Sequence, residues 1–260
     1  MGLYSVSTRR LMRRFFIPYF SADTTFVDLS PEVAHHVKTV LRLREGSDVV
    51  ICDGVGQCFE CRLDDLSKGC RVEVRRQWHE EESALSVTLI QGLPHSDKFD
   101  LILQKTTELG VGRVSPVVCE RCQYPIAPAK RERKLQRWQK IATEAARQSE
   151  RAWLPEVAEL TPFSTAIQNC DAELKLVLWE EAQQSLKDIL PSSAPSDVAV
   201  VVGPEGGLTA AEVALAVEHG FVVAGLGPRI LRTETAGLTL MAVLQYVYGD
   251  LNLPPRGQNP

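Results

Sequence analysis

Residues 201–213 read VVGPEGGLTAAEV, in which an apolar run breaks into a glycine-rich turn before a helix begins. Thr209-Ala210-Ala211-Glu212 has the pattern of a capping box, which marks a helix start, and Gly220 marks the helix end. Residues 203–207 are therefore predicted to form a tight turn after a buried strand. Open α/β sheets bind ligands at the carboxyl ends of their strands, so this turn is a candidate site.

A second turn of the same kind follows the next apolar run. Residues 221–227, FVVAGLG, read as a buried strand, which Pro228 and Arg229 end before a C-terminal helix predicted to reach about Tyr248. Glycines in one isolated turn usually reflect turn geometry alone. Two broken strand ends, at Gly203 and Gly227, instead favour one ligand site built by both turns.

The residues of these turns argue against a phosphate site. A Walker loop needs a Lys-Ser/Thr pair where this chain has Leu208-Thr209, and the dinucleotide fingerprint GxGxxG is absent. Glu205 would also repel a pyrophosphate. A cationic ligand with a flat heterocycle fits better, because glycine turns leave backbone amides and carbonyls free to bind its edge. S-adenosylmethionine, a sulfonium joined to adenosine, is such a ligand.

The rest of the chain divides into a β-rich part and an α/β part. Short apolar runs alternate with turns at first, and DGVGQ (53–57) predicts a hairpin. PEVAHHVKTVLRL predicts one helix, with Ser30 as N-cap and Pro31 at its first position. A domain boundary is expected at 76–84, after which strands and helices alternate and predict a mainly parallel sheet. The expected strands are 86–93, 114–120, 175–180, 197–203 and 221–227, and the expected helices include 98–110 and 131–149.

Composition predicts a soluble, globular protein with room for two domains. The chain has 260 residues, of which 44% are hydrophobic and 24% charged. No apolar run reaches the roughly 18 residues that a membrane span needs. The net charge of −4 is unevenly distributed: residues 129–151 hold eight Lys/Arg and three Glu, whereas 156–220 hold eleven acids and two Lys. The basic block is either a solvated helix face or a footprint for a polyanion.

The seven cysteines predict free thiols in a reducing, cytoplasmic setting. Cys52 and Cys119 lie in apolar runs, where a thiol behaves as a small hydrophobe. Cys58 with Cys61, and Cys119 with Cys122, form two CxxC pairs of the kind that can hold zinc. No metal site is expected. The first pair lies within a predicted strand, where positions i and i+3 point to opposite faces, and neither pair has a knuckle glycine.

The two glycine turns together with other segments resemble one family. GPEGGLTAAE (203–212) and LGPRILRTETAGL (226–238) are similar to the paired C-terminal motifs of SPOUT-class RNA methyltransferases, in particular the ribosomal RNA small subunit methyltransferase E family. The similarity covers nearly the whole chain and also includes MRRFFI (12–17), HHVKTVLRLREG (35–46), DKFDLILQKTTELGV (97–111) and RWQKIATEAARQSER (137–151).

That resemblance implies S-adenosylmethionine-dependent methylation of N3 of a specific uridine in 16S rRNA. It also implies a homodimer, a PUA-like β-barrel RNA-binding domain at 12–78 and an α/β trefoil-knot domain at 84–252. Residues 1–11 then read as a flexible leader and 253–260 as a tail. The knot comes from the resemblance alone, because general topological rules would exclude it.

The resemblance also implies a set of cofactor contacts, made mostly through the main chain. They are Leu178, Gly203, Glu205, Gly206, Leu226, Gly227, Ile230, Leu231, Thr235 and Ala236. Thr235 and its neighbour Thr233 equally read as helix N-caps.

Uracil N3 must lose an imide proton before it accepts a methyl group, so a cation near the uracil oxygens would stabilise the developing anion. Arg232 is the first candidate for this role and Arg229 the second, because both lie in the turn next to the predicted cofactor. Glu205 and Glu234 are each either a base or a cap of the following helix. The identity of the base is left open.

RNA contacts are expected from cations that neutralise phosphates. The cation candidates are Arg13, Arg14, Arg42, Arg44, Arg147 and Arg151, and the resemblance singles out Arg151 together with Gln148 and Ser149. A non-catalytic RNA-binding or ribosome-assembly factor would use the same surfaces, with the glycine turns as plain structure. A related methyltransferase acting on tRNA is the third reading.

Overall fold

The computed structural model describes residues 12–18, 20, 25–67 and 69–254. The chain divides into two compact units, which are Met1–Glu82 with Glu150–Trp153, and Ser83–Ser149 with Leu154–Pro260. They are called the N-terminal and C-terminal units below. The predicted leader and residues 255–260 of the predicted tail lie outside the described residues. The limits 12–78 and 84–252 stay predictions, and nothing in the sequence indicated that 150–153 groups with the first unit.

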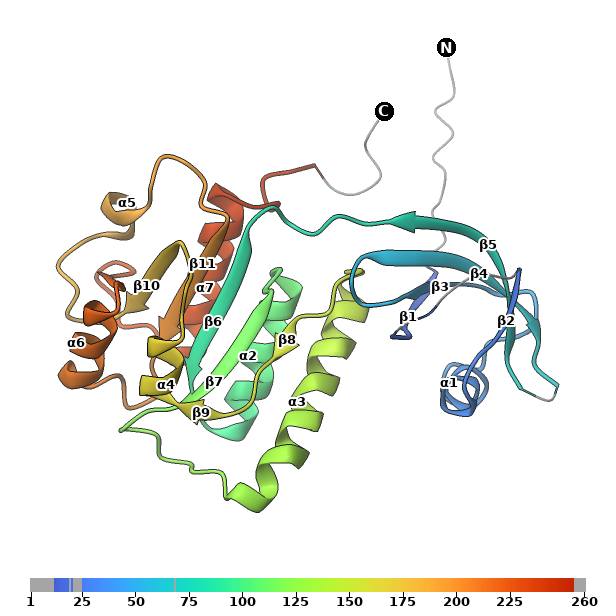
Figure 1. Cartoon of the computed structure of the whole chain (residues 1–260), viewed down its shortest axis with the longest axis horizontal. Helices are drawn as coiled ribbons and strands as arrows, with labels where there is room; N and C mark the ends of the chain where they lie inside the picture. Colours follow the sequence, from blue (N-terminus) through green and yellow to red (C-terminus); the bar gives the residue numbers. More distant parts are fainter. Residues whose placement is uncertain (1–11, 19, 21–24, 68, 255–260) are drawn as a thin grey trace, which may run out of the picture. The chain divides into compact units, whose positions relative to one another are not determined.

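The N-terminal unit is built on a five-stranded sheet (Figure 1). Its strands are β1 (Arg13–Phe16), β2 (Phe26–Asp28), β3 (Asp48–Cys52), β4 (Gln57–Asp65) and β5 (Arg71–His79), in the order β1-β3-β4-β5-β2. β1 runs parallel to β3, and the other pairs are antiparallel. The predicted 53–57 hairpin is confirmed as the connection between β3 and β4.

The helix predicted from Pro31 is confirmed at its start but is shorter than expected. α1 (Pro31–His35) begins at the N-cap Ser30, whose side chain accepts a hydrogen bond from the Val33 amide. The chain then continues as one π-helical segment, η1 (His36–Val40), and Arg42 follows with φ at 50°. That left-handed conformation cannot continue a helix, which explains why the predicted element ends early.

The expectation of a free thiol at Cys52 is wrong. Cys52 and Cys58 face each other across β3 and β4 and form a disulfide, with their Cα atoms 4.2 Å apart. Cys58 packs in a different apolar cluster from Cys61, as the alternation of side chains along a strand requires. Cys119 remains a buried thiol.

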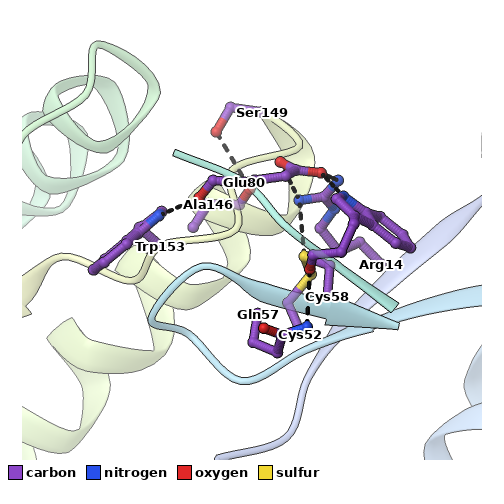
Figure 2. A network of polar contacts seen from close by, with 9 residues as sticks. Arg14, Cys52, Gln57, Cys58, Glu80, Ala146, Ser149 and Trp153 are labelled. Carbon is purple, nitrogen blue, oxygen red and sulfur yellow. Dashed lines mark hydrogen bonds and ion pairs between the residues drawn. A yellow bond between two sulfur atoms is a disulfide. The ribbon is translucent and has the colours of Figure 1, made fainter. Parts of the chain in front are cut away.

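Arg14 is held inside the N-terminal unit rather than at its surface. Figure 2 shows its guanidinium facing Glu80, to which it donates at 2.9 and 3.2 Å, with the disulfide of Cys58 beside it. The Arg14 side chain is 9% exposed, and Trp78 donates a further hydrogen bond to Glu80. This arrangement argues against the predicted phosphate contact, because the guanidinium is already paired and covered.

Replacing Arg14 with Met is expected to destabilise the protein by about 2 kcal/mol, because it leaves the Glu80 carboxylate without its cation in a largely covered position. Chemical denaturation followed by circular dichroism measures the change. Arg13→Met is the matched control, since Arg13 is exposed on the same strand and should change stability by less than about 0.5 kcal/mol. Equal stability of the two variants would contradict a structural role for Arg14.

The C-terminal unit is a parallel sheet between two helix layers, as predicted (Figure 1). Its strands are β6 (Ser86–Gly92), β7 (Arg113–Val118), β8 (Glu156–Val157), β9 (Thr161–Pro162), β10 (Leu174–Leu178), β11 (Asp197–Val202) and β12 (Val222–Ala224). The order is β12-β10-β11-β6-β7-β8, with β9 paired to β7. The helices are α2 (Ser96–Glu108), α3 (Pro128–Gln148), α4 (Phe163–Gln168), α5 (Leu186–Ile189), α6 (Ala210–Glu218) and α7 (Thr233–Val247).

The apolar run of β11 explains why helices cover both faces of this sheet. Val198, Val200 and Val202 pack into one cluster with residues of α2, α3 and α7. Ala199 and Val201 point the other way, into a second cluster with residues of α4 and α6. A strand with apolar residues on both faces must be covered twice. The trefoil knot stays a prediction.

Within the described part of the chain, no helix is long and apolar enough to cross a membrane.

Candidate functional site

Three strand ends and the start of α7 enclose a pocket of about 670 Å³ in the C-terminal unit. The segments after β10, β11 and β12 supply its walls, and Lys98 of α2 adds a cation. β11 and β6 are neighbours in the sheet, but the chain leaves them in opposite directions: from β11 it continues to β12 on one side, and from β6 to β7 on the other. The pocket therefore opens near the point where the strand order reverses. Open α/β sheets form their ligand crevices at such points.

The structure brings together most of the residues predicted from the sequence. The pocket is lined by Leu178, Gly203, Glu205, Gly206, Leu226, Gly227, Ile230, Leu231 and Ala236, together with Arg229 and Arg232. Thr235 is not among the lining residues. The sequence did not single out Lys98, Trp179 or Glu180, which also line the pocket.

The glycines of the first turn are required by close packing and by backbone conformation. A Cβ at Gly206 would lie 2.9 Å from Cβ and 3.0 Å from the carbonyl oxygen of Arg121. Gly207 has φ at 72°, a left-handed conformation that favours glycine. The capping box at Thr209 and Glu212 is confirmed and starts α6 directly after the turn. The turn therefore brings its main chain, together with the Glu205 side chain, to the pocket.

A buried polar link joins the two glycine turns. The Thr233 hydroxyl donates to the Gly203 carbonyl at 2.6 Å, and the Gln91 side-chain amide donates to the Thr233 hydroxyl at 2.9 Å and to the Gly203 carbonyl at 3.3 Å. Gln91 is fully buried. The N-cap reading of Thr233 is wrong, because Arg232 occupies the N-cap position of α7 and makes no side-chain cap bond.

Replacing Thr233 with Val is expected to cost about 1–2 kcal/mol of stability, because the Gly203 carbonyl and the Gln91 amide each lose a buried partner. Affinity for a ligand of the pocket should fall with it, since the two turns are no longer tied together. Thr239→Val is the matched control, because among the described residues the Thr239 hydroxyl donates to the carbonyl of Thr235 in its own helix. Thr233→Ser should restore both properties, and a Ser variant as weak as Val would contradict this role of the hydroxyl.

The pocket carries both signs of charge. Lys98 Nζ lies 3.2 Å from Glu205 Oε1 and 3.8 Å from Glu234 Oε2, and the His95 amide donates to Glu205 at 3.0 Å. Burial raises the pKa of Glu205, but the His95 amide and Lys98 outweigh it, so the pKa lies below its usual value. A lowered pKa makes Glu205 a weaker base and favours its service as a fixed negative charge.

Arg229 and Arg232 are the exposed cations of the pocket wall. Among the described residues the structure records no ion pair for either guanidinium, whereas Lys98 is engaged by acids. The two arginines are thus the pocket cations free to meet an incoming anion.

The predicted RNA contacts differ in how accessible they are. Arg13, Arg42, Arg44 and Gln148 are exposed. Arg147 pairs with Glu144 one turn earlier on α3, and the Ser149 hydroxyl donates to a helix carbonyl. The Arg151 side chain is 7% exposed and donates to Glu82 at 2.9 Å, so it is placed like Arg14 in a covered ion pair.

Comparison with known proteins gives two family matches that together cover most of the chain. The family model of an RNA methyltransferase domain matches residues 81–245, and that of an RNA methyltransferase PUA domain matches residues 29–73. The ribosomal RNA small subunit methyltransferase E of Bacillus subtilis is 36% identical over 247 residues, which is 90% of this chain and 96% of that protein. That of Synechocystis is 34% identical and covers 83% of this chain and 71% of its own length.

Solved structures resemble the chain over nearly its whole length. The ribosomal RNA small subunit methyltransferase E of Neisseria gonorrhoeae, bound to S-adenosylmethionine, has a TM-score of 0.84 at 36% identity, covering 92% of this chain and 99% of its own. A methyltransferase of Legionella pneumophila in complex with the same cofactor has a TM-score of 0.84 at 33% identity, with the same coverage. By sequence and by fold, this chain belongs to the ribosomal RNA small subunit methyltransferase E family of RNA methyltransferases.

Proposed function

We propose that this protein transfers the methyl group of S-adenosylmethionine to N3 of a uridine in 16S rRNA. The observation that carries the proposal is the pocket at the carboxyl ends of β10, β11 and β12, whose lining includes both glycine turns. Relatives of the chain are named for ribosomal RNA methylation, and two solved neighbours hold the cofactor.

The residues of the pocket fit this cofactor. A volume of about 670 Å³ is ample for an adenosine with a methionine chain. The main chain of 203–207 and 226–231 would hold the adenosine, and the carboxylates of Glu180 and Glu205 suit a sulfonium better than a phosphate. The bound cofactor would supply an electrophilic methyl group. The chain's own residues must then hold the uracil so that N3, the methyl carbon and the sulfur lie in one line.

Arg232 is assigned the role of stabilising the uracil anion. Loss of the N3 proton spreads negative charge over the two ring oxygens, and a preorganised guanidinium at that position lowers the barrier. Arg232 lines the pocket at the start of α7 and is exposed, as is Arg229, which is assigned a supporting role. Glu205 is assigned a fixed charge near the cofactor rather than proton transfer, because its pKa is lowered.

The RNA substrate would be held by exposed cations of the N-terminal unit. Arg13, Arg42 and Arg44 are the best placed, because their guanidinium groups are exposed. Such contacts position the RNA backbone without reading its sequence. A ribosomal substrate implies a cytoplasmic enzyme.

A homodimer is also proposed. Tyr246, Val247, Leu251 and Leu253 are 45–64% exposed at the C-terminal end of α7 and just after it. Large apolar side chains gathered over so short a stretch favour burial against a second copy.

The test uses small ribosomal subunits from a strain that lacks the gene, incubated with the purified protein and methyl-labelled S-adenosylmethionine. One methyl group on one uridine of 16S rRNA, located by mass spectrometry of nuclease fragments, is the expected result. Label on tRNA alone would redirect the proposal to the tRNA reading. A calorimetric titration with the cofactor that gives no heat, together with RNA binding, would leave only the non-catalytic factor.

A further inference from the structure

A tight turn after β7 carries a pair of cysteines next to the cofactor pocket. The Cys122 amide donates to the Cys119 carbonyl at 3.1 Å, which closes a turn with Glu120 and Arg121 at its centre. The Cys119 amide donates to the Cys122 sulfur at 3.2 Å. The ends of such a turn lie within about 7 Å, the range of Cα separations that a disulfide can bridge.

The same turn supports the first glycine turn of the pocket. Arg121 Nη1 donates to the carbonyls of Gly206 at 3.2 Å and Leu208 at 3.4 Å. The Glu120 amide donates at 2.8 Å to Glu212, the acid that also caps α6. Two residues that lie between the cysteines therefore hold the wall of the pocket in place.

The two thiols differ in exposure and in pKa, and both differences favour oxidation at Cys122. Cys122 is partly exposed, and Cys119 is buried. A hydrogen bond between the two sulfurs lowers the pKa of Cys122 to about 7 and raises that of Cys119. A reachable sulfur with thiolate character, next to a second thiol, is the arrangement found in redox-sensitive cysteines.

We propose that Cys119 and Cys122 form an oxidation site at which a peroxide produces an intramolecular disulfide, and that this disulfide weakens cofactor binding. The first step is attack of the Cys122 thiolate on a peroxide oxygen, which breaks the O–O bond, releases hydroxide and leaves a sulfenic acid. The Cys119 sulfur then attacks the Cys122 sulfur, the S–O bond breaks, and water leaves with the Cys119 proton. The peroxide is reduced by two electrons, and the two thiols are oxidised by two.

The effect on the pocket follows from the position of Arg121 and rests on the proposed function. The sulfurs must close to about 2.05 Å. Cys122 then loses its place as acceptor for the Cys119 amide, and the turn tightens around its two central residues. Arg121 is carried with the turn, so its hydrogen bonds to Gly206 and Leu208 are strained or lost. Loss of these charge-assisted bonds predicts about tenfold weaker binding of S-adenosylmethionine.

The disulfide itself is tested by tryptic mapping of the full-length protein after hydrogen peroxide treatment and alkylation. Trypsin cuts after Arg121, so the two cysteines fall in separate peptides, VSPVVCER (114–121) and CQYPIAPAK (122–130). The expected product is one linked species, lighter by two hydrogens than the two peptides together, which separates on reduction with dithiothreitol. Two separately alkylated peptides, or sulfinic acid at Cys122, would overturn the proposal.

Cofactor affinity is then measured by calorimetry before oxidation, after oxidation and after reduction. The parent should weaken about tenfold and recover. Cys170→Ser should do the same, because Cys170 is a free, partly buried thiol outside the turn formed by residues 119–122. Cys122→Ser should show no change on peroxide treatment, and this variant also controls for the disulfide between Cys52 and Cys58. A linked peptide with unchanged affinity would overturn the effect on the pocket. A reduced parent that binds no cofactor would refute the proposed function, whereas the mapping result would still decide the oxidation site.

Discussion

Replacement of Arg232 by Ala is expected to lower kcat for rRNA methylation by about 100- to 1000-fold, the cost of removing one preorganised donor to a developing anion. The Kd for S-adenosylmethionine should change by less than about threefold, because we propose that main chain of the glycine turns holds the cofactor. Single-turnover methylation of small subunits measures the rate, and calorimetry measures the affinity.

Arg113→Ala is the matched control for Arg232. Arg113 is the first residue of β7, so it lies at the amino ends of the parallel strands, whereas the pocket lies at their carboxyl ends. It pairs with Glu156 at the surface, where an ion pair contributes little to stability. It should leave both quantities unchanged. Arg229→Ala should lower kcat less than Arg232→Ala does. A normal kcat in Arg232→Ala, or a parallel loss of cofactor affinity, would refute the assignment.

Gly92→Ala is the second large effect expected, because the new Cβ has no space. It would lie 2.6 Å from Cδ and 2.7 Å from the backbone nitrogen of Pro204, in the first glycine turn, and 3.0 Å from the Cys119 sulfur. A backbone atom cannot swing aside as a long side chain can. We expect a loss of about 3 kcal/mol in stability from overpacking, and about 100-fold weaker cofactor binding because the turn is displaced.

Gly69→Ala is the control for Gly92→Ala. Among the residues that the structure describes, a Cβ at Gly69 meets no atom within 4 Å, and its backbone does not adopt a positive φ. Urea denaturation and cofactor titration should leave this variant close to the parent. If Gly92→Ala is too unstable to titrate at 25 °C, titration at lower temperature separates loss of fold from loss of the turn. Unchanged affinity in a folded Gly92→Ala protein would refute the link between this glycine and the turn.

The C-terminal unit was predictable where its signals are local. Apolar runs bounded by turns identified the main strands, and the capping box at Thr209 identified the start of α6. The turns after β11 and β12 were recognised because glycine and proline mark chain reversals by their own backbone preferences. Short elements such as β8, β9 and α4 were missed. The two strands have two residues each and the helix has six, and segments this short show too little periodicity to detect.

The partners of individual side chains could not be predicted, because these contacts join residues far apart in the sequence. Arg14 and Arg151 read as surface cations and proved to be covered and paired with acids. Thr233 read as an N-cap and instead joins two turns through Gln91. The disulfide of Cys52 depends on its register with Cys58, which only strand pairing sets.

By itself, the sequence determined the parallel α/β architecture, the edge of the sheet where a ligand would bind, and the two turns that line the pocket. Each of these follows from backbone preference and from the alternation of apolar residues, which are properties of short segments. Only the tertiary structure decided which charges remain free in the pocket, and which side chains hold its walls. Ion pairing and burial depend on the close approach of distant segments, and that approach exists only once the sheet and its helices have packed.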